Sequence, residues 1–279
     1  MSSLTFVGLG LGPRGLTLEG VEAIRRADAF YLEYYTTPHE PALLKELHSA
    51  TGKHPTVVDR EFVEDGRKIL EEAMGKEVVL AVLGDPMIAT THGELRARAI
   101  MAGIATRIVH AATIASAAAS ASGLHYYKFS RTVTVTRESA GRLGQAYHIL
   151  HQNLLEGAHT LLLLEYDLDS GEGVSPGEAM QGLLLAEGNF KRGVVGGGTF
   201  ALVLSRLGRE DSSMTAGTFE ELGGKEYGEP PHCVLVPGKM HFAEEEAVAA
   251  IFGVDQKKVK GNSDGVKRTA QTLVPKYVA

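Results

Sequence analysis

The sequence predicts an α/β protein with two α/β domains, on the basis of three observations. The chain has 279 residues, a comfortable length for two domains. Up to about residue 112, short apolar runs alternate with helical segments, which is typical of a parallel sheet. Residues 130–137 instead alternate threonine with valine and indicate a half-exposed strand. We therefore expect a parallel N-terminal domain over 1–112, a mixed-sheet C-terminal domain over 113–253 and a basic, weakly structured tail over 254–279.

The N-terminal domain is expected to begin with a strand at residues 4–7 that runs into a glycine-rich turn at 8–15. Glycines allow a tight turn and a close approach of the backbone to a ligand. Thr17 is placed to cap the following helix, because a hydroxyl there can accept a hydrogen bond from a free helical N–H. The further expected elements are a strand at 29–35, helices at 41–50 and 61–74 with a short strand at 56–58 between them, a strand at 78–83, a helix ending near 102 and a strand at 105–109.

The central stretch of this domain is Val78 to His92. Its first six residues are apolar and predict a strand buried on both faces. The strand ends at Gly84-Asp85-Pro86, where the proline keeps Asp85 out of the helical region. Ligands bind at the carboxyl ends of strands in open α/β sheets, so Asp85 is a candidate ligand residue. An ordinary strand-to-helix turn, with a helix capped near Thr91, is the alternative.

The C-terminal domain is expected to open with a helix of small residues, which allows close approach of a neighbouring backbone or ligand. Ser175-Pro176 is a favourable helix start, because proline suits the first turn. The expected elements are helices at 115–122, 146–156 and 176–185 and strands at 132–136, 159–167, 200–204 and 233–236.

Composition excludes several classes of protein. The net charge of −6 and the pI near 6.0 argue against non-specific binding of nucleic acid, which needs a basic face. The single cysteine, Cys233, excludes an internal disulfide framework. The first ten residues do not form a signal peptide, and apolar runs are too short to cross a membrane. We expect a soluble, cytoplasmic protein.

A dinucleotide-binding fingerprint, Gly10-x-Gly12-x-x-Gly15, follows the first strand. Glu33 stands where an acid could bind a ribose. Pro13 interrupts the turn, which departs from the usual pattern. An NAD-dependent oxidoreductase is therefore an alternative function.

Several separated stretches together resemble one family. They are FVGLGLG at the start, YLEYYT at 31–36, GDPMIATTHGELRARA at 84–99, HAATIASA at 110–117, GLHYYKF at 123–129, HTLLLLE at 159–165 and EPPHCVLVPGKMH at 229–241. In order and spacing, from residue 4 to about 252, these stretches resemble the diphthine synthases of the archaeal type. Those enzymes are methyltransferases of the tetrapyrrole-methylase fold class that use S-adenosylmethionine. The tail lies outside the resemblance.

The resemblance implies that the methyl donor lies in a cleft between the two domains. The positions that match the family's donor-binding residues are Leu11, Asp85, Ile88, Thr113, Ile114, Leu164, Leu207 and His232. A mostly apolar set that offers backbone groups suits an adenosyl ligand. Without the resemblance, the four leucine and isoleucine positions outside the domain junction would be assigned to the core, and His232 to capping a strand.

The resemblance also implies a substrate and a partner. The substrate is the amino nitrogen of a modified histidine, 2-(3-amino-3-carboxypropyl)histidine, on translation elongation factor 2. That nitrogen is trimethylated in diphthamide biosynthesis, and the enzyme is a homodimer. The chain departs from the family at Thr113, where serine is usual, at Glu165, where aspartate is usual, and at Ser130, where glycine is frequent.

No catalytic residue and no metal ligand is predicted, since an activated sulfonium needs only alignment and exclusion of water. His148 and His151 have the spacing of metal ligands on a helix but no third ligand. One aromatic ring among Tyr34, Tyr35 and Phe129 is expected to face the substrate. Two further alternatives stay open. One is a methyltransferase of the same fold that acts on a tetrapyrrole or ribosomal RNA, and the other is a non-catalytic ligand-binding module.

Overall fold

The computed structural model describes residues 2–34, 41–137, 144–167 and 170–277, without the side chains of residue 41 and residues 267–277. The chain forms two units. Unit 1 contains Met1–Ile114 and Gly208–Glu210, and unit 2 contains Ala115–Leu207 and Asp211–Ala279. The first division follows Ile114, two residues beyond the expected boundary, and the return of residues 208–210 to unit 1 was not foreseen from the sequence.

Unit 1 contains a five-stranded sheet in the order β3-β2-β4-β1-β5, and every neighbouring pair is parallel. The strands are β1 (Ser3–Gly8), β2 (Ala29–Glu33), β3 (Thr56–Val58), β4 (Glu77–Val82) and β5 (Ala105–Val109). The predicted parallel domain is confirmed, and β4 is the central strand. The carboxyl ends of all five strands therefore meet at one edge of the sheet.

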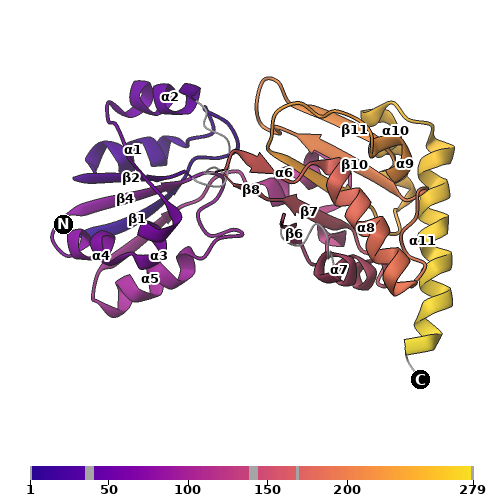
Figure 1. Cartoon of the computed structure of the whole chain (residues 1–279). Coiled ribbons are helices and arrows are strands. Elements are labelled where there is room, and N and C mark those ends of the chain that lie inside the picture. Colours follow the sequence, from indigo (N-terminus) through magenta and orange to yellow (C-terminus); the bar gives the residue numbers. More distant parts are fainter. Residues whose placement is uncertain (1, 35–40, 138–143, 168–169, 278–279) are drawn as a thin grey trace. The chain divides into compact units, whose positions relative to one another are not determined.

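Helices cover both faces of this sheet (Figure 1). They are α1 (Leu18–Arg26), α2 (Pro41–Thr51), α3 (Arg60–Asp65), α4 (Arg67–Ala73) and α5 (His92–Met101). Alternate residues of β4 enter two different cores. Val78, Leu80 and Val82 pack on the side of α3, α4 and α5, whereas Val79 and Ala81 pack on the side of α1 and α2. Burial on both faces explains why the strand is a continuous apolar run.

Two helix starts and one helix break show how local sequence sets the boundaries. Thr17 caps α1 by accepting a hydrogen bond from the Gly20 N–H, as predicted. Thr91 precedes α5 without a side-chain capping bond. The single helix expected over 61–74 is wrong, because Gly66 adopts a left-handed conformation with φ 61° and separates α3 from α4.

Unit 2 contains a mixed five-stranded sheet in the order β11-β10-β12-β7-β6, which confirms the predicted mixed sheet. Its strands are β6 (Val133–Val135), β7 (Thr160–Leu164), β10 (Phe200–Ser205), β11 (Ser213–Thr218) and β12 (His232–Val236), with a small β8 (Tyr166–Asp167) and β9 (Glu172–Gly173) hairpin beside them. The sequence did not indicate β11 or this hairpin. The helical elements are α6 (Ile114–Ser122), a 3-10 turn η1 (Tyr126–Lys128), α7 (Gly144–Leu155), α8 (Pro176–Phe190), α9 (Phe219–Leu222) and α10 (Phe242–Phe252).

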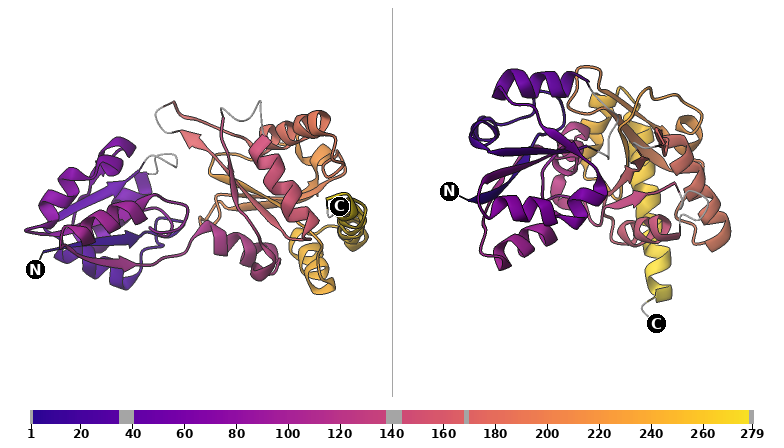
Figure 2. Two further views of the ribbon diagram at one scale, coloured as in Figure 1. Left: turned by 90° about the horizontal axis from the view of Figure 1, so that it is seen from below. Right: turned by 60° about the vertical axis from the view of Figure 1, so that its left-hand side comes forward.

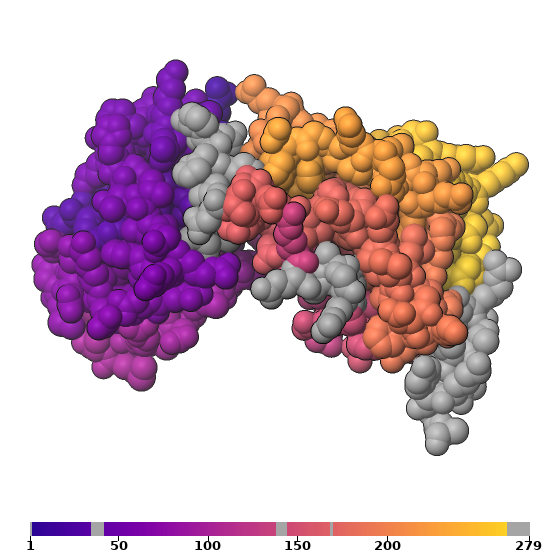
Figure 3. Space-filling model, in the orientation of Figure 1, coloured from indigo at the N-terminus to yellow at the C-terminus, as the bar shows by residue number. Residues whose placement is uncertain are grey.

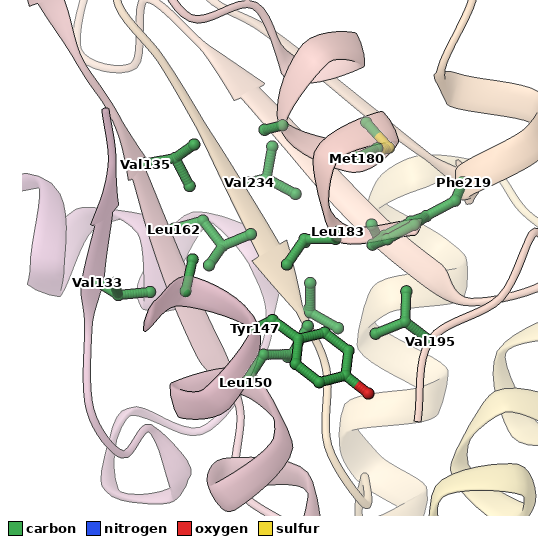
Figure 4. Packing of buried hydrophobic residues seen from close by; sticks show 14 of the residues in the cluster. Val133, Val135, Tyr147, Leu150, Leu162, Met180, Leu183, Val195, Phe219 and Val234 are labelled. Atoms are coloured by element: carbon green, nitrogen blue, oxygen red, sulfur yellow. The ribbon is translucent and has the colours of Figure 1, made fainter. Parts of the chain in front are cut away.

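One face of this sheet forms the main core of unit 2 with α7 and α8 (Figure 4). Tyr147 of α7 is fully buried there, and its hydroxyl donates to Glu187 at the end of α8. Ser175 and Glu178 form a capping box at the start of α8, so the predicted helix start is correct. The helix continues five residues beyond the predicted end at Leu185.

The expected weakly structured tail is wrong. Residues Gln256–Tyr277 form one helix, α11, which packs on α10 and α7 and is visible as a long rod in the right-hand view of Figure 2. Val259 is fully buried, and the Ser263 hydroxyl accepts from the Met240 N–H at 3.1 Å. The described atoms of α11 form part of the surface of unit 2 (yellow in Figure 3). Within the described ranges, no helix combines the length and the apolar character that a membrane crossing requires.

Candidate functional site

The loops after β1, β4 and β5 come together at the carboxyl edge of the sheet in unit 1. Gly10 and Gly84 exchange backbone hydrogen bonds at 3.2 and 2.8 Å, with φ angles of 71° and 75°. A Cβ atom on Gly8 would lie 2.7 Å from both the Ala111 Cβ and the Gly84 oxygen. The three loops are therefore in backbone contact, which only glycine permits at these positions.

Asp85 joins two of these loops. Its side chain is 5% exposed and accepts hydrogen bonds from the Met87 N–H at 2.9 Å, from His110 Nδ1 at 2.8 Å and from the Ala111 N–H at 3.3 Å. Burial opposes its ionisation, but these donors outweigh burial and hold the pKa of the carboxyl below its usual value. The predicted position at the end of the central strand is confirmed. Because both carboxylate oxygens have partners within unit 1, Asp85 is suited to shaping the loop.

A buried pair that sequence reasoning missed holds the other end of the same loop. His92 is 2% exposed and Glu33 is 6% exposed, and His92 Nε2 hydrogen-bonds to Glu33. His92 Nδ1 lies 2.8 Å from the Pro86 carbonyl oxygen, which also accepts from the Thr90 hydroxyl at 2.8 Å. Glu33 therefore does not have the role of a ribose-binding acid, and the sequence signal for this pair was only the polar Thr90-Thr91-His92 run after the loop.

The tip of the loop carries an exposed apolar side chain on a strained backbone. Ile88 is 46% exposed, and its neighbour Ala89 has a φ of 59°. A left-handed conformation at a residue other than glycine is uncommon and costs free energy, so the surrounding contacts must enforce it. The loop thus holds Ile88 outward in a defined position.

The other predicted residues of unit 1 flank this loop. Leu11 is half-buried, and a Cβ atom on Gly208 would lie 2.6 Å from the Leu11 Cβ. Thr113 and Ile114 are half-buried and lead from β5 into α6. The structure therefore places four of the five predicted residues of unit 1 in the loops that follow β1, β4 and β5, and the fifth, Ile114, at the start of α6.

The predicted residues of unit 2 lie at one edge of its sheet. Leu164 ends β7, His232 begins β12, and both line a pocket that also contains Glu165. His232 Nδ1 lies 2.9 Å from the Ser205 hydroxyl at the end of β10, and burial lowers the pKa of this imidazole. Leu207 follows the same strand and directly precedes Gly208 of unit 1.

Of the three residues predicted to supply a substrate-facing aromatic ring, the two that the structure describes differ in their burial. Tyr34 is 3% exposed and belongs to the core beside α1 and α2, so its ring does not reach a surface. Tyr35 lies outside the described residues. Phe129 is half-buried, with its ring edge-on to His159 at a centroid distance of 5.3 Å. Of the two helix histidines, His148 packs against the ring of Phe190 at 4.6 Å, and His151 is buried.

The two remaining departures from the family, Glu165 and Ser130, differ in their hydrogen bonds. The Glu165 carboxylate accepts from the Arg137 N–H at 2.8 Å. The Ser130 N–H donates to the His159 carbonyl at 3.2 Å, a backbone bond that any residue could make. Within the described part of the chain, Glu165 therefore makes a side-chain hydrogen bond, whereas the Ser130 bond uses only its backbone.

Comparisons with known proteins agree with one another. The sequence model of the tetrapyrrole (corrin/porphyrin) methylases matches residues 3–223. A diphthine synthase of Methanocella arvoryzae is 36% identical over 255 residues, which cover 90% of this chain and 98% of that protein. A diphthine synthase of Methanocaldococcus jannaschii is 34% identical over 250 residues, which cover 88% and 97%.

The fold gives the same result. A crystal structure of diphthine synthase aligns with a TM-score of 0.82 and 31% sequence identity, covering 93% of this chain and 99% of the other. The loops after β1, β4 and β5 also lie within residues 3–223, the part of the chain that the family model matches. The chain belongs to the tetrapyrrole methylase family and, within it, to the diphthine synthases.

Proposed function

We propose that this chain is an S-adenosylmethionine-dependent methyltransferase of diphthamide biosynthesis that acts on translation elongation factor 2. It trimethylates the amino nitrogen of the 2-(3-amino-3-carboxypropyl)histidine side chain. The observation that carries the proposal is the extent of similarity to the Methanocella arvoryzae diphthine synthase, because it covers 98% of that protein without a missing segment large enough to remove a domain.

The loops of unit 1 suit the methyl donor. At Gly84 the backbone has no side chain over it, and no described atom lies within 4 Å of the point where a Cβ would be. Bare backbone beside the exposed Ile88 supplies both polar groups and an apolar surface, the combination that an adenosyl ligand needs. We assign donor binding to Leu11, Asp85, Ile88, Thr113, Ile114, Leu164, Leu207 and His232.

In this proposal the donor-binding residues promote methyl transfer by holding the reactants in place. S-adenosylmethionine supplies a methyl group activated on a sulfonium, which leaves as a neutral thioether. Ile88 and Leu11 contact the ligand through apolar surface and keep water away, and the bonds around Asp85 hold the loop in its bound shape before binding. Fixed geometry of this kind lowers the barrier because the reactants need little reordering. The attacking amine must be neutral, so each round releases one proton.

Two other functions fit parts of the chain less well. Glu33, the acid on which a dinucleotide site would depend, is committed to His92. A methyltransferase that acts on a tetrapyrrole or on ribosomal RNA would share the donor loops, but the relatives that cover nearly the whole chain carry the name diphthine synthase. We also propose a cytoplasmic location and, from the family resemblance, a homodimer.

Ligand binding separates these functions first. Thermal unfolding is measured with S-adenosylhomocysteine and, separately, with NAD. A ligand at a hundred times its dissociation constant stabilises a protein by about 2.7 kcal/mol. We expect this shift with S-adenosylhomocysteine and none with NAD, and the opposite pattern would refute the methyltransferase proposal.

Transfer then tests the substrate. The purified chain is incubated with isotopically labelled donor and elongation factor 2 that carries the modified histidine, and a factor without the modification is the control. Label on the modified factor alone supports the proposal. A chain that binds the donor analogue but labels neither factor would instead fit a binding module.

A further inference from the structure

The loop Gly84–Thr91 has one anchor that no donor-binding role accounts for, the buried pair of His92 and Glu33. His92 is the first residue of α5, whereas Glu33 ends β2. The side chains are 59 positions apart in sequence, and both are almost completely buried. A polar pair that is buried from solvent contributes through the groups it holds in place.

The partners of His92 determine its protonation. Nδ1 faces the Pro86 carbonyl oxygen at 2.8 Å, which can only accept a hydrogen bond, so Nδ1 must carry a proton. Nε2 faces the Glu33 carboxylate, which in its ionised form also only accepts. With the Glu33 carboxylate ionised, both ring nitrogens donate, and the imidazole is then a cation.

We propose that His92, kept cationic by Glu33, is a positioning residue for the methyl-donor loop. This inference rests on the proposed function, because it assigns Ile88 and its neighbours to donor binding. The Pro86 carbonyl accepts from His92 and from Thr90, which fixes the peptide group between Pro86 and Met87. At the next turn Ala89 is held at a φ of 59°. Without the His92 bond, the Thr90 hydroxyl alone holds the carbonyl, and the loop conformation is enforced less strongly.

Charge makes the anchor dependent on pH. Burial by itself favours the neutral ring, but the Glu33 carboxylate and the Pro86 carbonyl outweigh it and raise the pKa of His92. Glu33 of β2 is the ionisable partner that contacts the ring among the described residues, Phe6 of β1 contributes an aromatic ring at 6.2 Å, and Asp85 with His110 is the other ionisable pair of the loop. A raised pKa means that the anchor is complete at low pH and is lost as the pH rises through the pKa of the folded protein.

Three variants separate positioning from stability. Glu33→Gln keeps every hydrogen bond, because the amide can donate to a neutral His92 whose Nδ1 still donates to Pro86. His92→Asn with Glu33→Gln keeps a donor near the position of Nδ1. His92→Leu with Glu33→Met removes both polar groups at similar volume, a replacement that buried ion pairs often tolerate.

Affinity for S-adenosylhomocysteine is measured by titration calorimetry from pH 6 to 10, with circular dichroism to verify folding. We expect the Leu/Met variant to bind at least tenfold more weakly at neutral pH and the two variants that retain a donor to bind within about threefold of the parent. The parent should lose affinity at high pH relative to Glu33→Gln, because that variant keeps the hydrogen bond without the charge. Titration of the ligand itself affects both proteins equally and cancels in the comparison. Nitrogen-15 shifts of His92 should show both ring nitrogens protonated at neutral pH.

The outcomes are distinct. Failure of the parent chain to bind S-adenosylhomocysteine would refute the proposed function, whereas the nitrogen shifts would still report the His92 charge. Parent-like binding by the Leu/Met variant, or a singly protonated His92, would overturn the inference while the function stands. If the Leu/Met variant does not fold, the test is a comparison of the ligand affinities of His92→Asn and His92→Gln, both in the Glu33→Gln background. They place the amide near Nδ1 and near Nε2 respectively, and only the first should bind well.

Discussion

His110 Nδ1 lies 2.8 Å from the carboxylate of Asp85, so the loops after β4 and β5 are joined by a direct side-chain bond. The Ala111 N–H donates to the same oxygen, which makes the carboxylate a bridge between the two loops. The residue that the sequence singled out as a ligand candidate thus also stabilises the edge where a ligand would bind.

Replacement of Asp85 by alanine should therefore destabilise the protein as well as weaken donor binding. Loss of hydrogen bonds to a buried charged group predicts a decrease of about 3 kcal/mol in the free energy of unfolding at pH 7. Because the pKa of the folded carboxyl is lowered, this contribution is complete above the usual value of 3.8 and fades as the pH falls below it. Urea denaturation at pH 7 and at lower pH measures both effects.

Asp264→Ala is the matched control, because Asp264 is exposed on α11. That change should leave the free energy of unfolding within about 0.5 kcal/mol of the parent value. Equal losses in the two variants would show that the bridge to His110 and Ala111 contributes nothing.

Thr113 offers a direct test of the predicted donor contact. If its hydroxyl bonds to the donor, Thr113→Val leaves a polar partner unsatisfied and should lower the affinity for S-adenosylhomocysteine by about five- to tenfold. Thr113→Ser keeps the hydroxyl and should bind like the parent chain. Titration calorimetry compares the three, and equal affinities would leave only the main chain of Thr113 in the site.

The parallel sheet could be predicted because burial on both faces makes β4 a continuous apolar run with a sharp end at Gly84. The strand β11 was missed because its sequence, SMTAGT, lies at a sheet edge and is mostly polar. Helix α11 was missed for a related reason. Its buried positions Val259 and Ser263 have the spacing of a helix face, but one of them is polar and lysines surround them.

Only the parts of the site that depend on neighbouring residues in the sequence could be predicted. Gly84-Asp85-Pro86 fixes a loop by its own backbone chemistry, so its place at the carboxyl edge followed from the sequence. The Asp85–His110 and Glu33–His92 pairs join residues 25 and 59 positions apart, and one sequence contains no signal for such pairs. The bond of Glu33 to His92, which argues against the alternative of a ribose-binding acid, was for this reason not visible in the sequence.

Substitution of the Glu244 carboxylate in unit 2 should lower the free energy of unfolding strongly. It is fully buried and accepts from His159 Nε2 at 2.8 Å, from the His125 N–H at 2.8 Å and from Lys128. Burial opposes ionisation, but these donors prevail and hold the pKa of the carboxyl far below its usual value. Glu244→Gln breaks a buried ion pair and should cost about 3–5 kcal/mol of unfolding free energy at pH 7.

The exposed Glu246 lies on the same helix, and Glu246→Gln is the control for this change. Because the pKa of Glu244 is lowered, the difference between the Glu244 variant and the parent should shrink as the pH falls below the usual range for a glutamate. A difference that stays constant with pH would contradict an ionised Glu244.

The packing of α11 predicts that the C-terminal helix is needed for stability. Val259→Ala removes two buried methyl groups and should lower the free energy of unfolding by about 2 kcal/mol. Lys257→Ala alters an exposed neighbour and should have little effect. Guanidinium denaturation of both variants measures the contrast, and equal stability would mean that α11 does not pack in solution as described.

The measurement that tests the central claim most directly is a count of the methyl groups transferred to elongation factor 2. Mass spectrometry follows the modified factor during incubation with the chain and excess S-adenosylmethionine. A nitrogen with three methyl groups has no lone pair left, so the reaction should stop at three additions on the one modified histidine. A product that halts at one methyl group with donor still in excess, or methyl groups on a different residue, would contradict the proposed function.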